Sequence, residues 1–391
     1  MTDLDIESAA AVGELSDRWS PLAASLYSSA TWLATSESPA ITRRYLVLSR
    51  LGEPVALVAT SKLDQPGGWI FGDPIALLLG LPGAPEQSFD PHLADRLKTL
   101  RDGLKPEDLY PATLCALSGG YLPGIVTPPG APAADVAAAL AQVENQAAEW
   151  DTMTTGILYV PERDRLLRAV LADRGYASFT PLAECVLHVT GWTTFDDYLQ
   201  SMRSQRRTNV RREIAAFAAS GATFSQVSVH AMGREHAELH IEHMRGYGHE
   251  LQVDRIMSLF RTIRDLFADT TNVIEMRKDG DLLGFLLIYD DRSWVYPKML
   301  GLCPAAQRPP YAYFNLGYYE TIRYAIRGGQ AGIVFGPESY EVKALRGLAA
   351  EPRTMFIKPP AALADQVAAV AATLDEAHRQ RFSAHPWRNK V

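Results

Sequence analysis

Cysteine is scarce in this chain of 391 residues, and its scarcity excludes several classes of protein. The three cysteines, Cys115, Cys185 and Cys303, are too few and too widely spaced for a disulfide framework or a zinc site. Neither a CxxC nor an HExxH motif occurs. We therefore expect a reduced protein whose chemistry, if it has any, does not depend on thiols.

Long apolar runs are also lacking. The longest, residues 75–81, is far short of the ~20 residues that a membrane-spanning helix needs. The first residues are acidic, and no basic segment precedes an apolar one as in a secretory signal. These features predict a cytoplasmic protein that is not inserted into a membrane.

The chain carries a modest excess of negative charge, distributed unevenly. Apolar residues make up 47% and charged residues 21%, which is typical of a folded globular protein, and the net charge is −7. Residues 1–187 hold 13 Lys and Arg against 23 Asp and Glu, whereas residues 188–391 hold 25 against 22. An anionic ligand should therefore prefer the second half. The overall acidity argues against binding to duplex DNA.

Hydrophobic patterns and turn signals predict an α+β fold of mixed, largely antiparallel sheets with flanking helices. Expected strands are 45–49, 55–59, 113–117, 156–160, 184–189, 223–229, 273–276, 282–289, 293–300 and 331–335. Expected helices are 133–150, 162–173, 195–219, 236–267 with a break near Gly246 and Gly248, 314–327 and 360–382. The order of elements recurs and predicts two related domains, residues 1–188 and 189–391, with the helix 360–382 at the end of the second.

Several segments after residue 189 resemble one family in the same order. They are residues 195–213 (FDDYLQSMRSQRRTNVRRE), 283–288 (LGFLLI), 299–302 (MLGL), 311–326 (YAYFNLGYYETIRYAI) and 335–347 (FGPESYEVKALRG). This set is similar to Fem-like tandem GNAT-fold N-acyltransferases of the peptidoglycan biosynthesis type. The resemblance implies two GNAT-like domains, the first of them degenerate, and transfer of an acyl or aminoacyl group to an amine by direct attack. It also implies a co-substrate, acyl-CoA or aminoacyl-tRNA, instead of a tightly bound cofactor. The partners would be a small amine and, for the second donor, a charged tRNA.

The chain departs from the GNAT pattern at the loop that normally holds the CoA pyrophosphate. Here the loop contains Gln307, Arg308, Pro309 and Pro310, and the two prolines supply no N–H to a phosphate. Gln307 and Arg308 remain candidates for phosphate binding. The equivalent stretch of the first half, residues 128–133, is also rich in proline. This loop favours an aminoacyl-tRNA-dependent, peptide-bond-forming enzyme over an acyl-CoA-dependent one, and a non-catalytic GNAT-like binding protein is the other alternative.

A cluster of arginines in the helix 195–219 is the first candidate for ligand binding. On a helical wheel Arg206 falls inside the apolar arc, whereas Arg203, Arg207 and Arg211 form a neighbouring stripe and Arg212 points away. The side chains of the first four could grip phosphates or a carboxylate. The alternatives are a solvated basic face and, for Arg206, a buried structural ion pair.

The segment after the last strand of the second half is the main catalytic candidate. A Gly-Pro break there should open a sheet edge to a substrate. Tyr340 could donate a proton to the leaving group, Lys343 could neutralise the developing oxyanion, and Glu338 could accept the proton of the amine. The alternative is an ordinary solvated loop.

Four further residues complete the predicted site. His243 is a candidate base, although helix-surface histidines are equally typical of its region. Lys298 is a charge within a strand, beside Pro297, which suggests a bulge or an edge. Asn315 and Tyr319 are predicted to line the pocket, with aromatic core packing as the alternative. No metal is expected, because the GNAT fold requires none.

Overall fold

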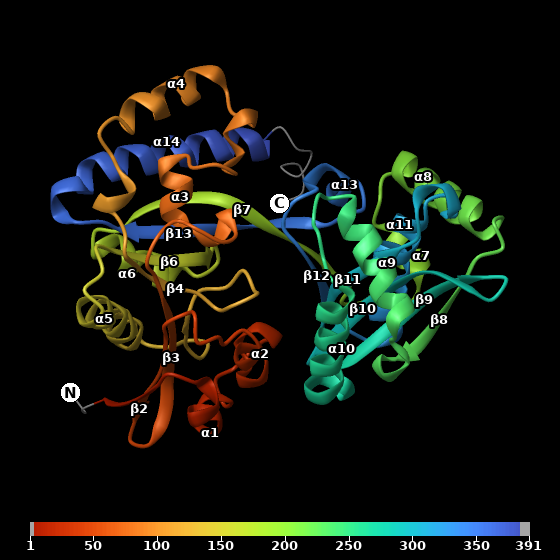
Figure 1. Ribbon diagram of the computed structural model, residues 1–391, viewed down its shortest axis with the longest axis horizontal. Coiled ribbons are helices and arrows are strands. Elements are labelled where there is room, and N and C mark those ends of the chain that lie inside the picture. The colour runs from red at the N-terminus through yellow and green to blue at the C-terminus, as the bar shows by residue number, and fades with distance from the viewer. Residues whose placement is uncertain (1–3, 384–391) are drawn as a thin grey trace. The chain divides into compact units, whose positions relative to one another are not determined.

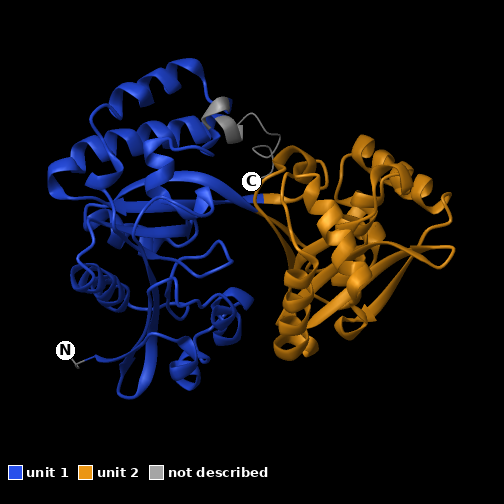
Figure 2. Cartoon of the chain, viewed as in Figure 1, with its two compact units in different colours: residues 1–184, 350–391 blue, residues 185–349 orange. Residues whose placement is uncertain are grey.

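The computed structural model describes residues 4–383, and the chain forms two compact units (Figure 2). Unit 1 comprises residues 1–184 and 350–391, and unit 2 comprises residues 185–349. Each unit combines a mixed, largely antiparallel sheet with flanking helices, which confirms the predicted α+β class. The outermost residues of the two predicted domains, 1–3 and 384–391, lie outside the described part of the chain.

The sheet of unit 1 is built from strands of both chain ends (Figure 1). Its strand order is β1-β2-β3-β4-β6-β13-β7, with β1 to β4 antiparallel, β6 parallel to β4 and β13 antiparallel to β6. The strands are β1 (Asp5–Ala9), β2 (Arg43–Arg50), β3 (Glu53–Leu63), β4 (Ala112–Cys115), β5 (Ile125–Val126, paired with β3), β6 (Thr154–Pro161), β7 (Ala177–His188) and β13 (Ala349–Lys358). The helices are α1 (Ser16–Trp19), α2 (Ala30–Thr35), α3 (Pro74–Leu79), α4 (Pro91–Leu100), α5 (Ala133–Glu149), α6 (Arg165–Asp173) and α14 (Ala364–Ser383).

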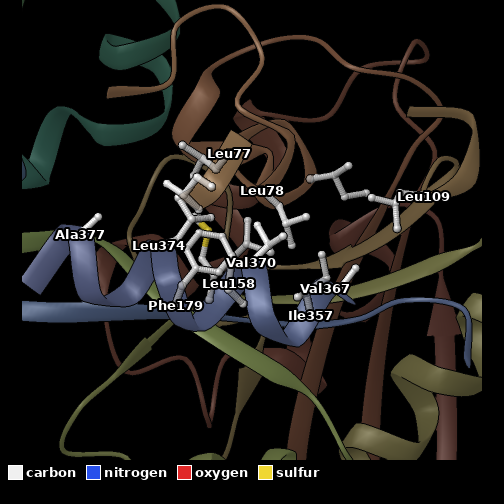
Figure 3. Packing of buried hydrophobic residues seen from close by; sticks show 14 of the residues in the cluster. Leu77, Leu78, Leu109, Leu158, Phe179, Ile357, Val367, Val370, Leu374 and Ala377 are labelled. Atoms are coloured by element: carbon white, nitrogen blue, oxygen red, sulfur yellow. The ribbon is translucent and has the colours of Figure 1, made fainter. Parts of the chain in front are cut away.

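The largest core cluster of unit 1 lies between its sheet and the layer of α3, α4 and α14 (Figure 3). The terminal helix α14 presents an apolar stripe to this core, in which Val367, Val370 and Leu374 are almost wholly buried. They pack with Phe179 of β7 and Ile357 of β13. The sequence pattern assigns this helix to the second domain, but the structure groups it with unit 1, because β13 pairs with β6 and returns the chain there.

Unit 2 has the strand order β7-β12-β11-β10-β9-β8. Strands β8 to β11 form an antiparallel meander, β12 is parallel to β11, and β7 is antiparallel to β12. The new strands are β8 (Thr223–Ser228), β9 (Thr271–Lys278), β10 (Asp281–Asp291), β11 (Trp294–Leu302) and β12 (Gly332–Gly336). The helices are α7 (Phe195–Gln200), α8 (Ser204–Ala218), α9 (Arg234–Arg245), α10 (Val253–Phe267), α11 (Ala312–Phe314), a π-helix (Asn315–Glu320), α12 (Thr321–Arg327) and α13 (Tyr340–Ala344).

Three predicted helices of unit 2 are divided in the structure. The predicted helix 195–219 is split into α7 and α8, and 236–267 is split into α9 and α10 beyond Gly246, as its glycines indicate. The helix 314–327 contains a π-helical turn that its sequence pattern does not reveal.

The two units share one topology: four antiparallel strands, a helical crossover and a fifth, parallel strand. The crossover contains α5 in unit 1 and α11 to α12 in unit 2. In each unit the strand beside the fifth one comes from elsewhere in the chain. β13 occupies this place in unit 1, and the end of β7 occupies it in unit 2.

Candidate functional site

A pocket of about 250 Å³ opens where β11 and β12 of unit 2 separate. The two parallel strands pair at Trp294–Gly332 and Val295–Ile333, near their beginnings. The pocket lies against the later residues of both strands, and it is lined by Leu286, Pro297, Lys298, Met299, Leu300, Tyr313, Gly317, Tyr318, Phe335, Pro337, Ser339 and Lys343. Main-chain groups that face each other across such a gap no longer bond to each other, so they can bond a ligand.

A β-bulge in β11 forms one wall of this pocket. Leu287 of β10 opposes Met299 and Ile288 opposes Pro297, so Lys298 is the additional residue on β11. Proline cannot donate a ladder hydrogen bond, which is consistent with an irregularity at this point. The structure thus places the predicted residue Lys298 on the pocket wall.

Aromatic rings of the crossover helices form a second wall. Tyr318 stacks on Phe335 of β12, with 5.1 Å between ring centroids and an interplanar angle of 17°. Tyr313 lies edge-on to Tyr318 at 5.9 Å. Burial raises the pKa of the Tyr318 hydroxyl far above its usual value, so this phenol stays neutral. The wall is therefore largely apolar.

Lys343 closes the pocket from α13 and is 6% exposed. Its Nζ donates to the carbonyl oxygens of Phe335 (3.1 Å), Gly336 (2.9 Å) and Pro337 (2.7 Å). These bonds hold a turn in which Gly336, Glu338 and Ser339 have φ values of 71°, 65° and 52°. Positive φ is uncommon for residues other than glycine. The ammonium group therefore orders the strand break as well as placing positive charge at the pocket.

The other two catalytic candidates of this segment lie beside the pocket. Tyr340, the first residue of α13, is 4% exposed, and Glu338 is partly buried in the turn. From the same turn Ser339, which was not predicted, does line the pocket. Serine is too common beside a strand break for the sequence alone to single out Ser339.

The predicted arginines do not converge on the pocket. Arg206 is partly buried and donates its Nη1 to the carbonyl oxygen of Ala344 at 3.0 Å, so it ties α8 to the end of α13. Arg203 and Arg211 are exposed, and Arg211 approaches Asp196 at 3.5 Å. Arg207 is partly buried on the same helix. Arg212 is exposed, as the helical wheel predicts.

A buried ion pair beneath the pocket was not anticipated from the sequence. Arg346 is 4% exposed, donates Nη2 to Glu213 Oε2 at 3.1 Å and places its Cζ 3.5 Å from the ring centroid of Phe314. Its partner lies 133 positions earlier in the chain, so no local pattern could reveal the pair.

This ion pair explains where Asn315 and Tyr319 lie, which differs from the prediction that they line the pocket. Tyr319 donates its hydroxyl to the Glu213 carboxylate, and Asn315 Nδ2 donates to the Glu213 carbonyl oxygen at 3.3 Å. Both residues are at most 1% exposed. They therefore anchor the π-helix on α8, and other residues of the crossover face the pocket.

His243 lies behind the aromatic wall. Its ring faces that of Tyr313 with 6.4 Å between centroids. Burial, together with the positive charge of Arg308 and the neighbouring His240, lowers the pKa of His243 to about 4. Arg308 donates Nη2 to the Cys303 carbonyl oxygen at 2.7 Å, and Gln307 is exposed in the preceding turn. With a pKa of about 4, the imidazole of His243 is uncharged at neutral pH.

Fold and pocket together define a tandem GNAT-like protein, and comparisons with known proteins agree. The chain belongs to the FemAB-like family, described as peptidoglycan biosynthesis/recognition, whose model matches residues 107–384. The crystal structure of FemX is similar, with 12% identity, a TM-score of 0.58 and coverage of 90% of this chain and 96% of that one.

Two further solved structures are similar to this chain at TM-scores below 0.5. A tandem GNAT protein from the clavulanic acid biosynthesis pathway is 12% identical, with a TM-score of 0.47 and coverage of 91% of this chain and 98% of that one. L-PGS from Bacillus licheniformis is 11% identical, with a TM-score of 0.44 and coverage of 68% and 82%. No curated protein matches the chain. Within residues 4–383, no helix is both long and apolar enough to span a membrane.

Proposed function

We propose that this protein transfers an acyl or aminoacyl group to an amine, and that the reacting carbonyl enters the pocket between β11 and β12. The observation that carries this proposal is the separation of the two parallel strands around a pocket of about 250 Å³. An extended donor could pair with the exposed strand edges, as peptides do when they add to a sheet. Membership of a family described as peptidoglycan biosynthesis/recognition supports the same class of chemistry.

The reaction would be a direct displacement. The amine nitrogen attacks the carbonyl carbon, the tetrahedral intermediate forms, and the C–O bond of an ester or the C–S bond of a thioester breaks. Positive charge from Lys298 and Lys343 at the pocket wall would favour the developing oxyanion. The amine's proton would pass to a base, for which Glu338 is the candidate, and Tyr340 would protonate the leaving group. In this scheme Lys343 also fixes the turn that carries Glu338 and leads to Tyr340.

The donor that fits the chain better is an aminoacyl ester of tRNA. The loop that would cradle a CoA pyrophosphate contains Pro309 and Pro310, which have no N–H. Beyond the prolines and Tyr311, the amide of Ala312 is already used, since its N–H donates to the Pro309 carbonyl oxygen at 3.2 Å. The exposed Arg203, Arg211 and Gln307 and the partly buried Arg207 would then serve as contacts to tRNA phosphates. The acceptor would be the amine of a peptidoglycan precursor.

Mass spectrometry of reaction products tests this function. Purified protein is incubated with single charged tRNAs or acyl-CoAs, each with a muramyl pentapeptide precursor or a free amino acid as acceptor. We expect an N-aminoacylated product that depends on charged tRNA, retained in the Arg212→Met control. An acetyl-CoA complex with its pyrophosphate on the amides of residues 308–313 would contradict the proposed donor. Binding of precursor without turnover of any donor would instead favour a recognition protein.

A further inference from the structure

Gly317 occupies an unusual place, because it lies in the π-helix and lines the pocket. A Cβ atom added to Gly317 would meet no atom within 4 Å. Its φ does not lie in the positive region that favours glycine. Neither packing nor backbone conformation therefore requires glycine at this position.

Glycine at this position costs stability. Inside a helix it is less favourable than alanine, because it loses more backbone freedom on folding. In most buried settings such a cost accompanies a close approach of another chain segment, but here the space beside the missing side chain belongs to the pocket. The natural occupant of that space is a ligand.

The residues around this space indicate which part of a ligand it accommodates. The π-helical turn, a form of helix often found at functional sites, brings Tyr313, Gly317 and Tyr318 to the same wall. Leu286 and Met299 contribute from β10 and β11. Gly317 is thus the gap in an apolar wall, and this gap suits an apolar group attached to the reacting carbonyl.

We propose that Gly317 determines substrate size: the absent side chain admits the acyl chain, or the amino acid side chain, of the donor. This inference rests on the proposed function, because it assumes that the group being transferred occupies the pocket. It predicts that any side chain at position 317 shortens the range of accepted donors without unfolding the protein.

A series of variants tests the size limit. Gly317→Ala and Gly317→Leu are compared with wild type using glycyl-, alanyl- and leucyl-tRNA, and acetyl- and hexanoyl-CoA. We expect Gly317→Ala to keep the smallest accepted donor and to lose about tenfold or more in kcat/KM for the largest, since one methylene in an apolar pocket changes selectivity by about 10–200-fold. Gly317→Leu should impair every donor. The matched control is Gly13→Leu, a glycine of unit 1 that is likewise free of neighbours within 4 Å and lies in a short helical turn.

A second experiment needs no donor. The three native cysteines are buried, so Gly317→Cys introduces a single accessible thiol. We expect iodoacetamide to alkylate this thiol in the folded protein while wild type stays unmodified, and bulkier maleimides to react at least tenfold more slowly. Equal rates for small and bulky reagents, or no reaction at all, would overturn the inference.

The two experiments separate this inference from the proposed function. Transfer by wild type with an equal loss for all donors in Gly317→Ala would overturn the role of Gly317 and leave the function intact. Size-dependent labelling of Gly317→Cys without transfer from any donor would support the pocket gap and contradict the transferase.

Discussion

Lys343 is the residue on which the order of the strand break most depends. Replacing it with methionine leaves the carbonyl oxygens of Phe335, Gly336 and Pro337 without their shared donor. A buried group that loses its hydrogen bond costs about 1–3 kcal/mol. We therefore expect Lys343→Met to lower the free energy of unfolding by at least this amount and to abolish transfer.

Urea unfolding measures the change, with Arg212→Met as the control. Arg212 is exposed, and surface substitutions usually change stability by within about 0.5 kcal/mol. Equal unfolding midpoints for Lys343→Met and wild type would contradict the clamping role. If Lys343→Met kept its stability but lost transfer, Lys343 would instead act only through its charge on the reacting group.

His243 should contribute a distinct pH dependence. Burial lowers its pKa to about 4 in the folded protein, whereas an unperturbed histidine titrates near 6.5. Between these values the unfolded chain binds more protons, so the contribution to stability is complete above about pH 6.5 and is lost as the pH falls towards 4. His243→Gln should weaken the fall in stability between pH 7 and pH 4.

NMR titration of the His243 ring in the folded protein gives the direct measurement. A midpoint close to 4 is expected, and a midpoint near 6.5 would show that the ring is solvated. Because the folded-state pKa lies below neutrality, protonation of His243 should also not produce a limb in the activity profile between pH 6 and 8.

At the residue scale, the sequence predicted which residues lie near the pocket better than it predicted which residues they contact. Lys298 and Lys343 were expected at the site from a proline in a strand and a Gly-Pro break, and both line the pocket. Asn315 and Tyr319 were expected there too, but both bond to Glu213, which lies more than 100 positions earlier and has no local signal. The partner of Arg206, the carbonyl of Ala344, lies 138 positions away and has no local signal.

At the scale of elements, one ion pair connects three segments that support the pocket. Arg346 after α13 bonds Glu213 of α8 and stacks on Phe314 of the crossover. Removing one partner of a buried pair costs about 3–5 kcal/mol because the other charge remains. Arg346→Leu should therefore destabilise unit 2 by this amount, as measured by chemical denaturation.

An exposed pair provides the matched comparison. Arg234 and Glu238 face solvent on α9, and such pairs contribute about 0–1 kcal/mol. Arg234→Leu should have little effect, and a double variant of Arg346→Leu with Glu213→Leu should recover part of the lost stability. A loss as small as that of Arg234→Leu would mean that Glu213 and Arg346 are well hydrated.

The succession of strands and helices was largely predictable, since alternation and helical periodicity are local properties. The break beyond Gly246 was also predictable, because glycine disfavours a helix interior. The pairing of β13 with β6 was not, because hydrogen bonding between strands about 200 positions apart depends on the whole sheet. For this reason the sequence pattern assigned the terminal helix to the second domain, whereas the structure groups it with unit 1.

At the scale of the whole molecule, each unit includes a strand from the other half of the chain. Strand β6 pairs with β13, from Thr155 opposite Lys358 to Pro161 opposite Arg353. A fragment that ends at residue 188 keeps β6 but loses β13 and α14. It would expose an unpaired strand edge and the apolar surface that Val367, Val370 and Leu374 cover. We therefore expect that the two predicted domains do not fold independently.

Two fragments test this dependence. The first contains residues 1–188, and the second joins residues 1–184 to 350–391 through a flexible Gly/Ser linker. We expect the first to show poorly dispersed amide resonances and no cooperative thermal transition, because its main core cluster is incomplete. The second retains the core residues that come from both parts of the chain, 1–184 and 350–391, and should unfold cooperatively. A well-dispersed spectrum and a cooperative transition for residues 1–188 alone would mean that this part of the chain is stable without β13 and α14. The opposite result would establish that the first half of the chain needs β13 and α14 in order to fold.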